Sequence, residues 1–110
     1  MDILSSPVNS VAHGMLDALS EQQKLLAKNI ANANTEGYQP TYLNFEKIMT
    51  DLNSNNSINV KSESYIEKKS NNVQLDMELL QMQETVLKYK TVLDALSRKG
   101  ALMKTVMGTR

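Results

Sequence analysis

The stretch that decides the fold is LDMELLQMQETVLKYKTVLDALSRKGALMKTVM, residues 75–107. Its apolar residues recur in two columns with a step of seven, and Gly100 is the one break in the series. This heptad pattern predicts a long helix with a narrow a/d seam that needs a partner helix. Such a helix would span roughly 50 Å, which predicts an elongated hairpin or a shared bundle. The columns are Leu75, Met82, Tyr89, Leu96 and Met103, and Leu79, Val86, Leu93, Gly100 and Met107.

The partner is expected near the N-terminus, where a second amphipathic stripe begins after Pro7, a residue suited to the first position of a helix. Gln22 and Gln23 interrupt the stripe, which makes it weaker than the C-terminal one. The helix should end between Ala33 and Gly37, because Asn, Gly and the following Pro40 favour helix termination. The stripe consists of Ala12, Met15, Leu16, Leu19, Leu26, Ile30 and Ala33.

The middle of the chain is short. Helical spacing from Tyr42 to Leu52 predicts two or three turns, and Ile58, Val60, Tyr65 and Ile66 favour a short strand or hairpin. The predicted fold is therefore mainly α, with long N- and C-terminal helices paired as an elongated coiled-coil-like hairpin and a short irregular or β insert between them. We divide the chain into an N-terminal helix and Asn-rich turn (1–38), an insert (39–72) and a C-terminal helix (73–110).

Composition points to association rather than to a large core. The chain has 110 residues, 41% of them hydrophobic, with no Trp and one Phe, so a thin core is expected. Twelve basic and twelve acidic residues give no net charge, which argues against nucleic acid as a partner and leaves self-association unopposed. Without cysteine there is no disulfide or thiolate chemistry. We expect no membrane span and no cleaved signal peptide.

Residues that could carry chemistry have simpler explanations. His13 and Asp17 are spaced as half a metal site on a helix, but nothing supplies the other ligands. Asp76, Glu78 and Glu84 fall in the first turns of the C-terminal helix, where carboxylates complement the helix dipole. No phosphate loop, nucleophile elbow or zinc spacing occurs. We therefore expect no enzyme activity, no cofactor, no metal and no small-molecule substrate.

The segment from Asn29 to Tyr38 reads NIANANTEGY and resembles the signature of the flagellar rod and hook axial proteins, which carry such an element at the end of an N-terminal helix. The matching positions include Asn29, Ile30, Ala31, Asn32, Thr35, Gly37 and Tyr38. In the C-terminal half, VQLDME (73–78), LKY (87–89) and ALSRK (95–99) resemble the proximal rod proteins of this family.

This resemblance implies a structural subunit whose terminal helices pair in a helical tube, at the cell-proximal end of the flagellar rod. Its implied partners are homologous rod proteins, further copies of itself, the adaptor between membrane ring and rod, and the export gate. It also implies torque transmission and export through the flagellar type III apparatus to a periplasmic rod, without signal cleavage. Two other interpretations stay open: a helical adaptor or export chaperone, and another proximal rod component.

A tube subunit needs more contact surface than one hairpin uses. Val11 and Leu25 flank the N-terminal stripe, and Leu80, Leu87 and Val106 flank the C-terminal one, so we expect them to be left over for neighbouring subunits. We also expect partial disorder in the first thirty residues of the isolated protein. Asn29, Asn32 and Asn34 either cap the helix, the favoured interpretation, or bond across a subunit boundary. The residues expected in helix packing and in the subunit interface are Leu19, Leu26, Ile30, Leu75, Leu79, Met82, Val86, Tyr89, Leu93, Leu96 and Met103.

Overall fold

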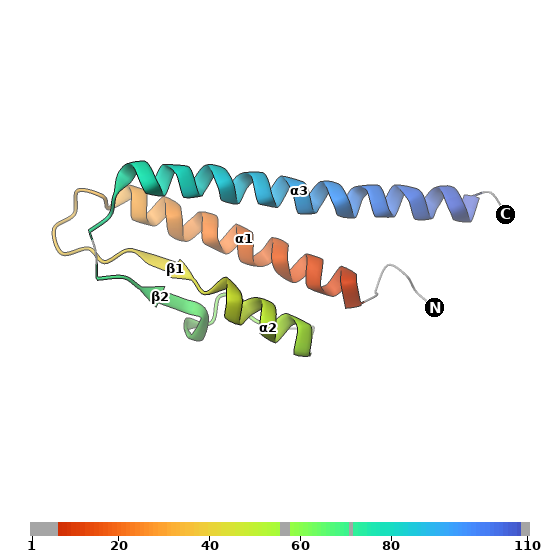
Figure 1. Cartoon of the computed structure of the whole chain (residues 1–110), viewed down its shortest axis with the longest axis horizontal. Helices are drawn as coiled ribbons and strands as arrows, with labels where there is room; N and C mark the ends of the chain where they lie inside the picture. Colours follow the sequence, from red (N-terminus) through yellow and green to blue (C-terminus); the bar gives the residue numbers. More distant parts are fainter. Residues whose placement is uncertain (1–6, 56–57, 71, 109–110) are drawn as a thin grey trace.

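The structure, a computed structural model, describes residues 7–55, 58–70 and 72–108, although the side chains of 7–9, 55, 101–103 and 105–108 lie outside the description. The molecule is elongated, with extents of 63 × 26 × 15 Å (Figure 1). Its described elements are α1 (Pro7–Ala31), β1 (Thr41–Leu43), α2 (Phe45–Asn55), the 3-10 turn η2 (Glu63–Tyr65), β2 (Ile66–Lys68) and α3 (Leu75–Gly108). The predicted fold class, two long helices joined by a short insert that contains a small sheet, is confirmed.

α1 is the central element, since α3 covers one side of it and the insert covers the other (Figure 1). Its described part starts at Pro7, the first residue that the structure describes, and the helix ends at Ala31, two residues before the expected break. Leu19 and Leu26 are buried, and so is Ala18 on the face that meets the insert. α1 therefore has packing partners on two sides within one chain, and the partial disorder expected in the first thirty residues of the isolated protein stays a prediction.

The insert forms the main hydrophobic core together with α1. β1 pairs antiparallel with β2, and α2 packs beside them. Val11 and Leu25, which we expected to be left over, instead pack against this core. That expectation was wrong because it allowed no partner for this face of α1. The buried core residues are Ala18, Leu43, Ile48, Leu52, Val60 and Tyr65.

The predicted helix in the insert is confirmed, but it begins at Phe45 rather than at Tyr42. Asn44 sets this start, because its side-chain Oδ1 accepts a 3.0 Å hydrogen bond from the Lys47 N–H as an N-cap does. Tyr42 therefore belongs to β1, and the strand that we expected to include Ile58 and Val60 was wrong. Val60 contributes a buried side chain from a turn instead of from a strand.

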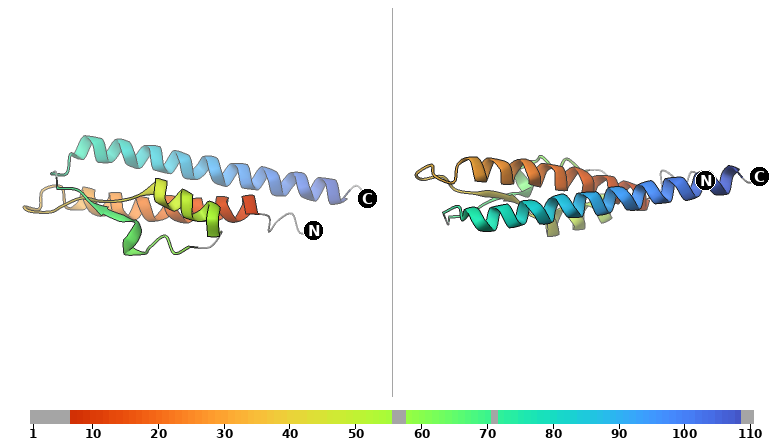
Figure 2. Two further views of the ribbon diagram at one scale, coloured as in Figure 1. Left: turned by 60° about the horizontal axis from the view of Figure 1, so that its bottom comes forward. Right: turned by 90° about the horizontal axis from the view of Figure 1, so that it is seen from above.

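α3 runs alongside α1 in the opposite direction (Figure 2). Its described side chains that face α1 include Met82, Tyr89 and Leu96, which are half-buried. In the second predicted column Leu79 and Leu93 are exposed and Val86 is half-buried, whereas the buried residues of α3 among those described are Glu78 and Thr85. Within the described part of the chain, no helix combines the length and the apolar character needed to cross a bilayer.

Candidate assembly surface

A polar joint of five residues, Asn29, Tyr38, Thr41, Tyr42 and Glu78, ties α1, β1 and α3 together. The Asn29 side chain is fully buried and makes four hydrogen bonds. Its Nδ2 donates to the Thr41 carbonyl at 2.9 Å and to the Glu78 carboxylate at 3.3 Å. Its Oδ1 accepts from the Tyr38 hydroxyl and from the Thr41 N–H, both at 3.0 Å. Asn29 therefore fixes the relative position of three elements.

Two side chains of α1 take the place of a third strand beside β1. Asn29 bonds both backbone groups of Thr41, and Gln22 Oε1 accepts the Leu43 N–H at 2.9 Å. Gln22 and Asn29 are seven residues apart, so they lie on one side of α1. The edge of β1 that β2 does not cover is thus satisfied inside the molecule, as a buried strand edge requires.

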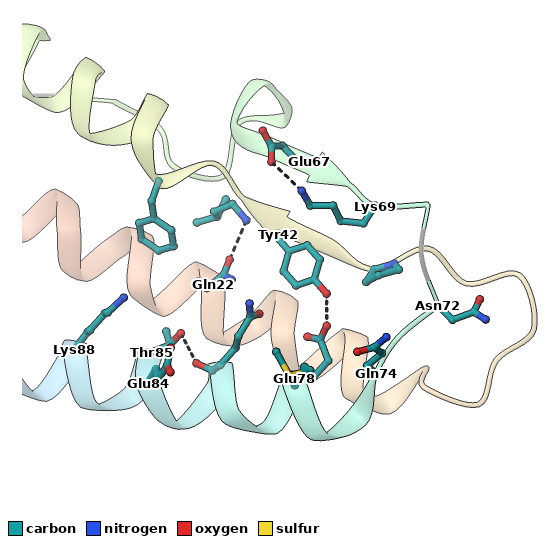
Figure 3. A pocket seen from close by; sticks show the side chains of 15 residues that line it. Gln22, Tyr42, Glu67, Lys69, Asn72, Gln74, Glu78, Glu84, Thr85 and Lys88 are labelled. Carbon is teal, nitrogen blue, oxygen red and sulfur yellow. Dashed lines mark hydrogen bonds and ion pairs between the residues drawn. The ribbon is translucent and has the colours of Figure 1, made fainter.

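Glu78 brings a carboxylate into the joint at the first turn of α3. It is 3% exposed and accepts a hydrogen bond from the Tyr42 hydroxyl (Figure 3). It accepts a second one from Asn29. Burial, followed by the hydrogen bond to Glu78, raises the pKa of Tyr42 well above its ordinary value. The tyrosine therefore stays neutral and keeps donating. Dipole compensation, our sequence-based explanation of Glu78, does not account for its burial or its partners.

The rest of the Asn-rich motif shapes the turn after α1. Asn32 Nδ2 donates to the Lys28 carbonyl at 2.9 Å, which confirms local capping for this asparagine. For Asn29 the expectation of capping was wrong, because its side chain bonds Thr41, Tyr38 and Glu78 instead. Asn32 Oδ1 also accepts from the Thr35 hydroxyl at 3.1 Å. Gly37 has a φ of +77°, a backbone angle that glycine adopts without strain. Tyr38 then returns over the turn to reach Asn29.

A groove of about 590 Å³ opens between the insert and one flank of α3 (Figure 3). Leu43, Phe45 and Met77 give it apolar patches. Exposed polar side chains border it, and Glu84 and Lys88 come from α3. The groove is open, and no catalytic groups of the described residues converge on it. It therefore suits contact with a segment of another protein more than enclosure of a small ligand. Its α3 residues are Gln74, Met77, Glu78, Gln81, Glu84, Thr85 and Lys88.

The opposite flank of α3 carries an apolar ridge, which we define as Leu75, Leu79, Val86 and Leu93. The three leucines are each 45% exposed, although the heptad pattern placed them in the helix seam. Glu78 and Thr85 occupy the contact with α1 in their place. Leu80 and Leu87 are also exposed, on the outer side of α3, as expected for residues left over for neighbours. The side chain of Met103 lies outside the described residues.

The remaining sequence candidates do not converge on a reactive centre. His13 is exposed, and among the described residues no group of His, Asp and Glu side chains is arranged to hold a metal ion. Ile30 is half-buried, one turn after the buried Leu26 on α1, and its role in helix packing stays a prediction. The chemistry of the described surface is therefore that of contact: an exposed apolar ridge, a groove and a rigid joint between them.

The hydrogen bonds by which Gln22, Tyr42 and Glu78 connect α1, β1 and α3 were not predicted from the sequence. Gln22 did leave a signal, since a glutamine inside an apolar stripe needs a buried partner or exposure to water. Tyr42 and Glu78 left none, because their contact joins residues 36 positions apart. Such a pair can be recognised only when the fold brings β1 against α3.

Two comparisons with known proteins agree with the motif. The family model described as flagella basal body rod protein matches residues 11–39, which cover α1 from Val11 onward and the Asn-rich turn. Over 126 aligned positions that cover 97% of each chain, the sequence is 21% identical to the flagellar basal body rod protein FlgB of Bacillus subtilis (strain 168). The resemblance to flagellar rod proteins, and to the FlgB type in particular, is thereby confirmed. Both matches name structural rod proteins and neither names an enzyme.

Proposed function

We infer that this chain is a structural subunit of the bacterial flagellar basal body, at the proximal end of the rod. The inference starts from its similarity to flagella basal body rod proteins and to FlgB. We further propose that it has no enzyme activity. In this role it joins the membrane ring and the export gate to the rod and transmits torque as part of a rigid tube. Its neighbours are homologous rod proteins and further copies of itself.

The observation that carries this proposal is the exposure of the α3 leucines. Leu75, Leu79 and Leu93 lie on one flank of a long helix, and each keeps 45% of its surface exposed. Apolar side chains exposed in a row along an element indicate a contact surface. A neutral chain offers no net repulsion to a second copy. The joint at Asn29 holds α3 against α1, so the ridge is presented in one fixed orientation.

Placement in the periplasmic part of the rod and export without a cleaved signal are also part of the proposal. They rest on the resemblance to proteins of the flagellar axis. Contacts with a membrane-ring adaptor and with the export gate rest on the same ground. The alternative of a helical adaptor or export chaperone predicts a soluble complex of fixed stoichiometry, whereas a rod subunit remains with the basal body after purification.

The test replaces the two central leucines of the ridge in the chromosomal gene by Leu79→Gln and Leu93→Gln. We expect cells that do not swim and basal bodies that lack the rod, because the lost contact lies between subunits. Since both side chains are already half exposed, the purified variant should unfold at nearly the wild-type urea concentration. Asn53→Gln, on the exposed face of α2, is the control and should leave swimming intact.

Two results would count against the proposal. One is normal swimming in cells that lack the chain altogether. The other is a wild-type chain that never accompanies purified basal bodies and is recovered instead in a soluble complex of fixed ratio. The second result would favour the adaptor or chaperone interpretation.

A further inference from the structure

The ridge and the groove lie on opposite flanks of the same helix. At about 100° per residue, Leu79, Val86 and Leu93 fall on one side of the line where α3 meets α1. Gln81 falls on the other side, where it borders the groove. So does Lys88 (Figure 3). A chain that carries two different surfaces on opposite flanks can join copies head to tail, which gives an open array instead of a closed pair.

The two surfaces also agree in length. The ridge runs from Leu75 to Leu93, about 27 Å along the helix, and the α3 wall of the groove runs from Gln74 to Lys88, about 21 Å. Leu43 and Phe45 come from the insert and line the far side of the groove, and Met77 is 54% exposed on its α3 wall. Leu43 is itself buried, so Met77 and the half-buried Phe45 are the apolar side chains that the groove offers to a ridge of similar length.

Charges beside the two surfaces select one register. Glu84 and Lys88 lie four residues apart on the groove wall. Lys90 and Asp94 also lie four residues apart, beside the ridge. A shift of six residues, about 9 Å, places Lys90 opposite Glu84 and Asp94 opposite Lys88 in two parallel helices. Glu84, Lys88 and Lys90 form no ion pair within the described chain, and Asp94 has an exposed one with Arg98.

We propose that the ridge of one copy packs into the groove of a second copy, with the two α3 helices parallel and shifted by six residues. The contact pairs Lys90 with Glu84 and Asp94 with Lys88 at its outer edge. Charge pairs of this kind fix register and partner choice more than they add affinity. This inference rests on the proposed function, because it names the lateral neighbour within the rod.

The first test exchanges the charges. Lys90→Glu and Glu84→Lys should each reduce swimming, by roughly twofold or more, because each places like charges face to face. The double variant should recover most of the loss, since opposite charges meet again between neighbouring copies. Lys90→Glu combined with Glu46→Lys on α2 is the control and should show no recovery. Failure of the double variant to exceed its two parents overturns the register.

The second test uses the absence of cysteine from the chain. Chains with Lys90→Cys and chains with Glu84→Cys are expressed together, and purified basal bodies are treated with a short bismaleimide. A linked dimer is expected from the mixture, and none from either chain alone or from Lys90→Cys with Glu46→Cys. A dimer from Lys90→Cys chains alone would show a two-fold contact through the ridge and would overturn the inference.

The two proposals fail in different ways. If the cysteine chains accompany the basal body without forming the mixed dimer, the ridge-and-groove contact is wrong and the rod assignment stands. If the wild-type chain does not accompany basal bodies at all, the rod assignment itself is wrong.

Discussion

Asn29→Ala is expected to destabilise the protein far more than its small change in volume suggests. The substitution removes four hydrogen bonds from a side chain with no exposed surface. The Thr41 N–H, the Thr41 carbonyl and the Tyr38 hydroxyl then lose a partner, while Glu78 keeps only Tyr42. Because β1 is anchored to α1 through Thr41, the loss affects the insert and α3 together.

The magnitude follows from the number and burial of these bonds. A typical intramolecular hydrogen bond contributes about 1 kcal/mol net, and a buried group left without a partner costs about 1 to 3 kcal/mol. Water can reach some of the partners, since three of the four bonds are only partly buried. We therefore expect a loss of about 3 kcal/mol, which is a large share of the roughly 5 to 15 kcal/mol that stabilises a small domain.

The assay is urea unfolding of the purified chain, followed by far-ultraviolet circular dichroism. The midpoint should fall by about 2 M for a chain of this size. Asn32→Ala is the matched control, because it changes the same residue type in the same motif at a site with local, exposed bonds. It should cost at most about 1 kcal/mol. Equal midpoints for the two variants would refute the assignment of Asn29 as the centre of the joint.

Three further variants test the packing around Gly14 and Gly100 and the titration of Tyr42. A Cβ on Gly14 would lie 2.4 Å from Leu52 Cδ2, whereas a Cβ on Gly100 would meet no neighbouring atom of the described residues within 4 Å. Gly14→Ala should therefore destabilise by about 1 to 3 kcal/mol in thermal unfolding, and Gly100→Ala should stabilise by up to about 1 kcal/mol. The fold raises the pKa of Tyr42 above its ordinary 10.0. The stability that the neutral tyrosine contributes to the folded state is therefore present below pH 10.0 and is lost as the pH rises further. Tyr42→Phe should lessen this alkaline loss in unfolding curves measured at increasing pH, and an unchanged loss would contradict the role given to burial and Glu78.

The Gly100 variant also bears on assembly. Its open surroundings in the single chain leave room for a side chain, so a stabilised protein is expected in solution. If swimming nevertheless falls in cells that carry Gly100→Ala, a neighbouring helix approaches closely at this position. Normal swimming would mark the glycine as a tolerated defect of the heptad pattern.

The sequence by itself predicted the two long helices, the region near which α1 ends and the family that the chain resembles. Pro7, the Asn-rich turn and Gly37 act through local backbone preferences, which residues close in sequence express without help from the fold. The short helix of the insert was predictable for the same reason, apart from its first turn. The motif from Asn29 to Tyr38 was enough to indicate the family, because its residues are contiguous.

The tertiary structure alone decided which side of α3 faces α1. The heptad pattern offered Leu79 and Leu93 for the seam, since apolar residues are normally the ones that become buried. The fold placed Glu78 and Thr85 there instead, because Tyr42 and Asn29 supply hydrogen bonds to Glu78 from elements far away in the sequence. A buried carboxylate needs such partners. The periodicity of the sequence cannot reveal these partners. The sides of α3 that carry the ridge and the groove are therefore decided by how the insert folds against α1.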